Sequence, residues 1–218
     1  MRKRFELLVF DWDGTLMDSA ACIAAALQGA CRDLGHAVPS ERDARYVIGL
    51  GLNDALAHVL PDVPSSDYGT VVERYRHHFL LADGGTTLFS GVSEMICELR
   101  NAGHLLAIAT GKSRRGLDRA LETTGLRQFF DATRCADEGH SKPDPGMLYW
   151  IMDTLRISPE RTLMIGDTTH DMEMARAAGV ARLALAHGAH ERAALLEHAP
   201  LACLNDCIEL KTWLAQNA

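Results

Sequence analysis

Short apolar segments alternate with helical patterns along this chain, and this alternation limits the possible folds more than any other feature of the sequence. Four segments have the length and the apolar character of strands buried on both faces: 6–10, 104–109, 162–165 and 180–186. A fifth segment, 129–133, shows the same pattern more weakly. Helical patterns lie between them, at 92–101, 114–124, 145–155 and 171–178. Alternating strands and helices form βαβ units, so we expect an α/β fold with a doubly wound parallel sheet.

One segment breaks this alternation. The sequence from about 19 to 90 contains helical patterns, at 27–34, 54–60 and 68–81, but no convincing strand. A helical block inserted after the first strand of an α/β sheet is typical of a cap over the active end of that sheet. We therefore expect a Rossmann-like core made of residues 1–15 and 91–218, and an all-helical cap domain at 16–90. The last stretch, 191–218, also has a helical pattern and should pack on the sheet.

Composition and charge exclude several classes of partner. The 22 Lys and Arg residues face 29 Asp and Glu, a net charge of −7, so the basic surface of a nucleic-acid binder is absent. No apolar run approaches the roughly 18 residues of a membrane span, and the run after the basic first residues stops at Asp11, too early for a signal peptide. We expect a cytoplasmic protein with reduced thiols and no nucleic-acid or membrane partner. A monomer and a homodimer both remain open.

Polar and charged residues follow the predicted strands at the edge where ligands of open parallel sheets bind. They are Asp11-Trp12-Asp13-Gly14-Thr15 after the first strand, Thr110-Gly111-Lys112-Ser113 after the second, Gly166-Asp167-Thr168-Thr169-His170-Asp171 after the fourth, and Lys142 before the helix that opens at 143–145. Together they supply four carboxylates, a hydroxyl group and a cation. That set suits a hard divalent cation and a phosphate group.

Each of these pieces alone also has an ordinary structural explanation. An Asp-Gly pair forms turns, Asp167 could cap a helix, and Thr168 with Asp171 fits a capping box. Lys142 taken singly is typical of a solvated surface lysine. The functional interpretation is favoured because every piece follows a strand at one edge of the same predicted sheet.

These motifs resemble those of a known family. The segment Asp11-Trp12-Asp13-Gly14-Thr15-Leu16 is similar to motif I of the haloacid dehalogenase-like hydrolase superfamily. Thr110 is similar to motif II, Lys142 to motif III, and Gly166-Asp167 with Asp171 to motif IV. The resemblance covers about residues 6–185. The helical insert resembles the subclass whose cap lies between motifs I and II, and phosphoglycolate phosphatase-like proteins in particular.

The resemblance implies a phosphatase that depends on Mg²⁺. Asp11 would be the nucleophile that forms an aspartyl-phosphate, and Asp13 would protonate the leaving oxygen and then activate water. Magnesium would bind the carboxylates of Asp11 and Asp167 and the backbone carbonyl of Asp13. Asp171, outside the direct ligands, would orient a metal-bound water or Lys142.

The resemblance also implies how the phosphate and the rest of the substrate are held. The phosphate oxygens would be bound by Thr110, Gly111 and Lys142. A short apolar loop in the insert is expected to contact the non-phosphate part of a small substrate: Gly49, Leu50, Gly51, Leu52 and Asn53. The partner is therefore expected to be a small phosphorylated metabolite.

The substrate and some alternatives stay open. Phosphoglycolate is the best single expectation, with sugar phosphates and nucleotide monophosphates as competitors. Asp13 disfavours a haloacid dehalogenase proper, and the insert lacks the lysine that a phosphonatase needs. A phosphomutase is disfavoured because the loop has no cation, although Arg45 keeps it open. Two other classes remain: a receiver-like phospho-acceptor module, and a catalytically idle binding protein.

Overall fold

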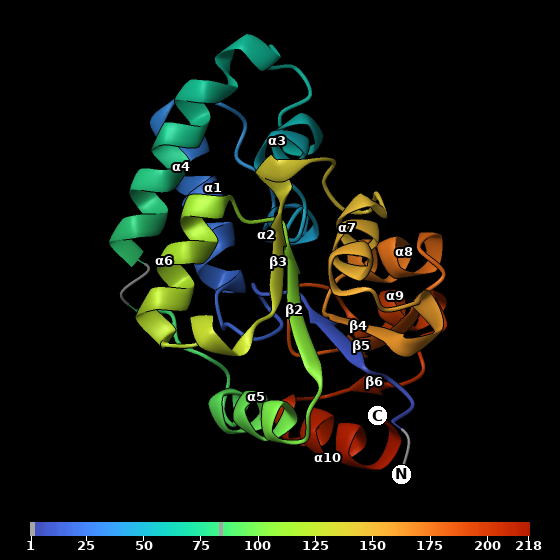
Figure 1. The fold of residues 1–218 in the computed structure, drawn as a ribbon. Coiled ribbons are helices and arrows are strands. Elements are labelled where there is room, and N and C mark those ends of the chain that lie inside the picture. Colours follow the sequence, from blue (N-terminus) through green and yellow to red (C-terminus); the bar gives the residue numbers. More distant parts are fainter. Residues whose placement is uncertain (1–2, 83–84) are drawn as a thin grey trace.

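The computed structural model describes residues 3–82 and 85–218, and its centre is a six-stranded parallel sheet (Figure 1). In chain order the strands are β1 (Leu7–Phe10), β2 (Leu105–Thr110), β3 (Ala132–Cys135), β4 (Thr162–Gly166), β5 (Ala181–Leu185) and β6 (Cys203–Leu204). Their order across the sheet is β3-β2-β1-β4-β5-β6. The chain thus adds strands first on one side of β1 and then on the other, and β1 lies at the point where ligands bind in such sheets.

The central strand is buried on both faces, which explains its continuous apolar sequence. All four residues of β1 are buried; Leu8 and Phe10 lie in one core cluster, and Leu7 and Val9 lie in another. The first cluster includes residues of α5 (Val92–Asn101), α6 (Arg114–Thr124) and α10 (Cys207–Asn217). The second includes residues of α7 (Gly146–Leu155) and α8 (Thr169–Ala177). Helices therefore cover both faces of the sheet, as a doubly wound fold requires.

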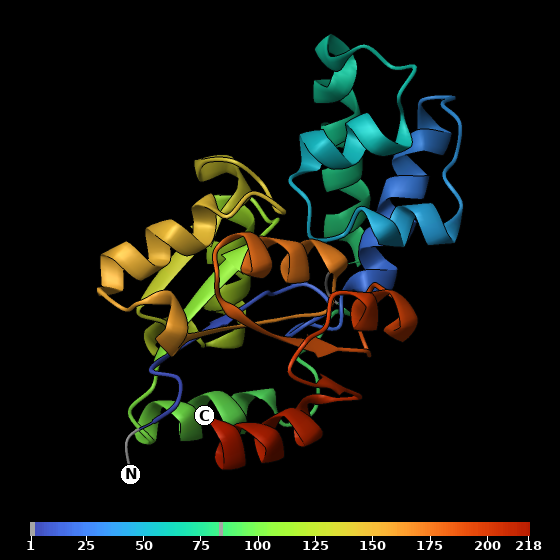
Figure 2. The same ribbon diagram turned by 90° about the vertical axis from the view of Figure 1, so that its right-hand side faces the viewer.

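The insertion between β1 and β2 is helical, as predicted. It contains α1 (Ala20–Asp33), α2 (Glu41–Tyr46), α3 (Leu52–Val59) and α4 (Tyr68–Ala82), with the short 3₁₀ turn η1 (Ser65–Asp67) before α4. These helices have their own apolar cluster, in which Leu27, Leu56 and Val71 are buried. Figure 2 shows them as a separate group beyond one end of the sheet. The boundaries of the two domains stay a prediction.

The two chain segments that join the cap to the core run side by side. Met17 forms an antiparallel bridge with Leu88, and the Phe89 N–H donates to the Leu16 carbonyl at 3.0 Å. The cap is therefore attached through one paired connection rather than through two independent linkers. No helix among the described residues is long and apolar enough to cross a membrane.

Four parts of the chain differ from the sequence-based expectation. Helix α1 begins at Ala20, whereas the helical pattern was predicted only from residue 27. The strand predicted at 129–133 begins three residues later, at Ala132, because Arg127–Phe129 forms a 3₁₀ turn (η3). Helix α2 was not predicted. The tail predicted as helical contains α9 (Arg192–Glu197), then β6, which pairs with β5, and only then α10. A strand of two residues is too short to give a periodic signal.

Candidate active site

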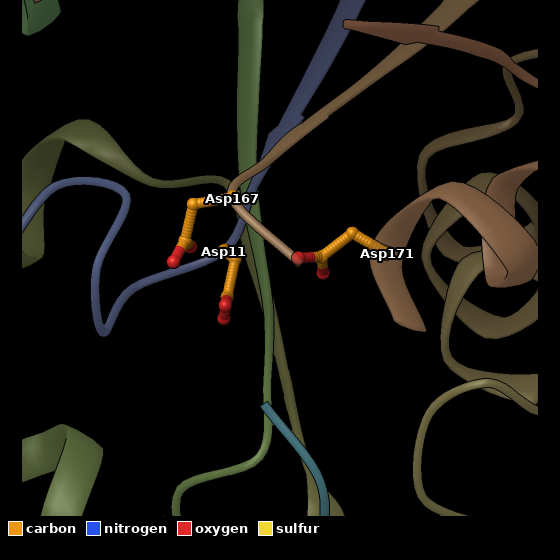
Figure 3. A group of neighbouring side chains, drawn as sticks. All are labelled: Asp11, Asp167 and Asp171. Carbon is orange, nitrogen blue, oxygen red and sulfur yellow. The ribbon is translucent and has the colours of Figure 1, made fainter. Parts of the chain in front are cut away.

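Three buried aspartates meet at the carboxyl end of the central strands. Asp11 directly follows β1, Asp167 directly follows β4, and Asp171 lies in the first turn of α8. One carboxylate oxygen of each lies within 4.8 Å of the others, and Figure 3 shows the three side chains pointing into one space. Because β1 and β4 are hydrogen-bonded neighbours, the two strand-end residues are brought together by the register of the sheet.

Lys142 lies among these carboxylates and is not a surface lysine. Its Nζ is 2.8 Å from Asp11 Oδ1 and 2.7 Å from Asp171 Oδ1, and its side chain is fully buried. Burial by itself would lower the pKa of Lys142, but the negative charges of Asp11 and Asp171 outweigh it and raise that pKa above its ordinary value. Lys142 therefore remains a cation inside the site.

One ammonium group does not balance three buried carboxylates. Burial raises the pKa of Asp11 well above its ordinary value, and the charges of Asp171 and Asp167 add to this, while Lys142 opposes it. Burial and the charge of Asp171 raise the pKa of Asp167 to about 7. Asp11 Oδ2 is buried and accepts no hydrogen bond from the described residues. A divalent cation would supply the missing positive charge, and carboxylate oxygens are the ligands that Mg²⁺ prefers, so these residues fit such an ion.

Asp167 is held in place by contacts that the sequence does not predict, one of them from Thr15 in the segment after β1. Thr15 Oγ1 donates to Asp167 Oδ1 at 2.6 Å, and the Ala189 N–H donates to Oδ2 at 2.7 Å. A Cβ atom at Gly14 or Gly188 would lie 2.2 or 2.0 Å from Oδ2, so both positions need glycine. Ala189 contributes its backbone N–H, so its side chain gives no indication of this role. The sequence indicates only that Ala189 follows β5, at the same edge of the sheet as Asp167.

The two carboxylate oxygens of Asp171 have different partners: one caps helix α8 and the other pairs with Lys142. Thr168 and Asp171 form the predicted capping box, with the Thr168 N–H donating to Asp171 Oδ2 at 3.1 Å. The other oxygen, Oδ1, is the one that faces Lys142. The helix cap thus fixes the carboxylate in the orientation that places Oδ1 beside the ammonium group.

Asp13 faces the cap side of the site and has a cationic neighbour. Ser19 Oγ donates to its Oδ1 at 2.7 Å, and Lys112 Nζ donates to both carboxylate oxygens at 2.9 Å. The same ammonium group lies 4.9 Å from the centre of the Phe79 ring on α4. Lys112 lies in the segment after the second predicted strand, but nothing in the sequence indicates that its side chain reaches Asp13.

Thr110 and Gly111 lie at the end of β2, next to β1, where the cap loop contacts the core. Thr110 is buried, and its hydroxyl oxygen accepts from the Lys112 N–H at 3.2 Å. A Cβ atom at Gly111 would lie 2.5 Å from the Leu50 carbonyl oxygen and 2.6 Å from that of Gly49. The loop therefore rests directly on this glycine.

The predicted cap loop is shorter than expected. Gly49 and Leu50 belong to it, while Leu52 and Asn53 form the first turn of α3. The Gly51 N–H donates to Ser141 Oγ, one residue before Lys142. The loop thus contacts the core at two places, Gly111 after β2 and Ser141 before Lys142.

Two histidines form a second contact between cap and core. The Tyr46 carbonyl at the end of α2 accepts from His170 Nε2 at 2.8 Å and from His190 Nε2 at 3.0 Å. His190 Nδ1 accepts from the Thr169 N–H at 3.0 Å, so its proton lies on Nε2. Burial, with the nearby His170, lowers the pKa of His190 to about 4, and burial also lowers the pKa of His170. Both rings are neutral near pH 7.

Comparisons with known proteins agree with this geometry. The family model described as "Haloacid dehalogenase-like hydrolase" matches residues 8–185. The "Probable phosphatase IndB" of Dickeya dadantii is 36% identical over 84% of this chain and 82% of its own length. A "Phosphoglycolate phosphatase" of Vibrio cholerae is 31% identical over 85% of this chain and 86% of its own length.

The fold also matches a solved structure. A hydrolase from Pseudomonas syringae superposes with a TM-score of 0.90 and covers 98% of this chain and 99% of its own, at 20% identity, which supports the fold alone. The family model spans most of the chain and includes all four predicted motifs. With its cap inserted between β1 and β2, this chain belongs to the haloacid dehalogenase-like hydrolases, among the phosphoglycolate phosphatase-like members.

Proposed function

We propose that this protein is a magnesium-dependent phosphomonoesterase that acts on a small phosphorylated metabolite through an aspartyl-phosphate on Asp11. The observation on which the proposal rests is the environment of Asp11. Its Oδ1 is paired with Lys142, and its Oδ2 is buried, accepts no hydrogen bond from the part of the chain that the structure describes, and faces the space where the other two carboxylates meet. A carboxylate with one unengaged oxygen beside fixed positive charge is suited to nucleophilic attack on phosphorus.

The first half of the proposed reaction uses Asp11 and Asp13. An Asp11 oxygen attacks phosphorus, the P–O bond to the leaving group breaks, and Asp13 gives its proton to the departing oxygen. In the second half Asp13 takes a proton from a water molecule, which attacks the phosphorus and cleaves the bond to Asp11. Inorganic phosphate and the free alcohol are the products, and Asp13 ends with the proton with which it began.

Positive charge is essential here because an anionic carboxylate must approach an anionic phosphate. Lys142 supplies one positive charge and holds Asp11 in the ionised form. Mg²⁺ bound by Asp11 and Asp167, with the Asp13 carbonyl, would supply further charge at the phosphate oxygens. Thr110 and Gly111, at the end of the neighbouring strand, would hold the phosphate oxygens through a hydroxyl and a backbone N–H group.

For the substrate we propose 2-phosphoglycolate, since relatives about 30% identical are named for it. A sugar-phosphate phosphatase or a phosphomutase of the same fold is the alternative. Arg45, the cation that kept the phosphomutase open, forms an ion pair with Glu41 on its own helix. That pairing favours the phosphatase.

The test is steady-state hydrolysis of an aryl phosphate and of a panel of phosphorylated metabolites, with and without Mg²⁺. We expect metal-dependent turnover in the wild type and none in Asp11→Asn, while the matched control Asp153→Asn, on the exposed side of α7, keeps full activity. A wild-type protein that hydrolyses no ester of the panel would contradict the proposal. A stable phospho-aspartate in that idle protein would instead indicate a phospho-acceptor module.

A further inference from the structure

Lys112 is a cation at the site for which the proposed reaction has no use. The chain has only four lysines, at positions 3, 112, 142 and 211, and Lys142 is already engaged by two buried carboxylates. Lys112 extends from the segment after β2 to the Asp13 carboxylate and lies against the ring of Phe79 on α4. Its side chain is 14% exposed, so it borders the space between core and cap rather than the open surface.

The position of Lys112 relative to a bound substrate follows from its contact with Asp13. In the proposed reaction the ester oxygen of the leaving group lies within hydrogen-bond reach of Asp13, about 3 Å from its carboxylate. Lys112 Nζ is 2.9 Å from both oxygens of that carboxylate, so it lies no farther than about 6 Å from the ester oxygen. Lys112 is therefore within reach of a group carried by the leaving group, whereas Lys142 pairs with Asp11, the proposed nucleophile.

The ammonium group has capacity for a further partner. It carries three N–H donors, and its two hydrogen bonds to Asp13 leave one. The Phe79 ring covers one side of it, which lowers its access to water and strengthens its attraction for an anion. The neighbouring cap loop, which includes Leu50, is uncharged.

We propose that Lys112 is a specificity-determining residue that binds a second anionic group on the leaving group. The preferred substrates are phosphate monoesters whose carboxylate carbon or second phosphorus lies two to four bonds from the ester oxygen. This inference rests on the proposed function, and it assigns the substrate class. 2-Phosphoglycolate meets the requirement, because its carboxylate carbon is two bonds from the ester oxygen.

The test compares two substrates that differ only in charge, 2-phosphoglycolate and its neutral amide, 2-phosphoglycolamide. We expect wild-type kcat/KM to favour the carboxylate by about 10- to 100-fold, the range of a charge-assisted hydrogen bond. Lys112→Met should abolish this preference, and Lys112→Arg should keep much of it. The matched control Lys211→Met, at a surface pair with Glu98, should keep all of it. The bisphosphate of ethylene glycol, run alongside, shows whether phosphate replaces the carboxylate.

Two outcomes would overturn the inference and leave the proposed function intact. One is a wild type that hydrolyses both esters equally well. The other is an equal loss on both esters in Lys112→Met, which would show that Lys112 serves only to hold Asp13. A binding measurement separates the two proposals further: calorimetry on Asp11→Asn should show the same preference for the carboxylate ligand, and adding Lys112→Met should remove it. That preference is measurable even in a protein without turnover.

Discussion

Replacing Lys142 by Met should destabilise the metal-free protein strongly, although the two side chains are similar in length. Lys142 is fully buried and, among residues 3–82 and 85–218, is the only side-chain cation in contact with Asp11 and Asp171. Removing one partner of a buried ion pair leaves an uncompensated charge and costs about 3–5 kcal/mol. Total stabilities of about 5–15 kcal/mol are usual, so the variant should still fold, with a clearly lower midpoint.

The assay is urea unfolding at pH 7.5 without divalent cations, with Lys211→Met as the control. Lys211 pairs with Glu98 at 2.7 Å on the surface, and its loss should cost at most about 1 kcal/mol. The double variant Lys142→Met/Asp171→Asn should regain part of the stability, since it removes one of the two stranded carboxylates. Added Mg²⁺ should stabilise Lys142→Met more than the wild type, because in the variant the bound ion replaces the positive charge that Lys142 supplied beside the buried carboxylates.

The pH dependence gives a further check on the same reasoning. Without Lys142 the pKa of Asp11 rises further in the folded protein, so protonation of that carboxylate favours folding at low pH and the benefit is lost as the pH rises. The cost of the substitution should therefore be smaller at pH 5 than at pH 7.5. A loss below about 1 kcal/mol at pH 7.5, or a loss that does not change with pH, would refute the argument from uncompensated charge.

Two other predictions follow from the contacts between cap and core. Gly111→Ala should raise KM several-fold and expose the cap to proteolysis, because its Cβ would lie 2.5 Å from the Leu50 carbonyl; unchanged KM and unchanged proteolysis would contradict a closed loop. Because the pKa of His190 is lowered to about 4 in the folded protein, acid should cost stability between about pH 6.5 and pH 4, by at most about 3 kcal/mol. His190→Asn, which can still accept from the Thr169 N–H and does not titrate, should show a shallower loss in acid unfolding, and an identical loss would assign the effect to other groups.

Much of the core could be predicted from sequence because its strands are buried on both faces. β1, β2 and β4 are largely apolar for that reason, and β5 is buried over its last three residues, Leu183 to Leu185. Helices α5 and α6 are followed by Gly103 and Gly125, which have the left-handed backbone expected after a helix. Helix α2 could not be found in the same way. Its six residues are mostly polar, and only Ala44 is buried, so it lacks an apolar stripe.

The candidate site was predictable wherever a side chain of distinctive chemistry follows a strand. Asp11, Asp167 and Lys142 meet as that reasoning requires. The contributions of Ala189 and Lys112 were not predictable, for two physical reasons. Ala189 acts through a backbone N–H that no side chain signals, and the partner of Lys112 is set by the path of a loop rather than by sequence spacing.

The place of β1 in the sheet also sets the order in which the protein can assemble. Leu7 pairs with Leu105 on one side and with Thr162 on the other, so both neighbours of this strand are synthesised long after it. The cap lies between, and its contacts among successive helices can form while β1 is still unpaired. Pairing between such distant segments is slow and leaves an apolar strand exposed during synthesis. A chain halted before β4 therefore contains Asp11 and Lys142 but neither Asp167 nor Asp171, so the group of three carboxylates is still incomplete.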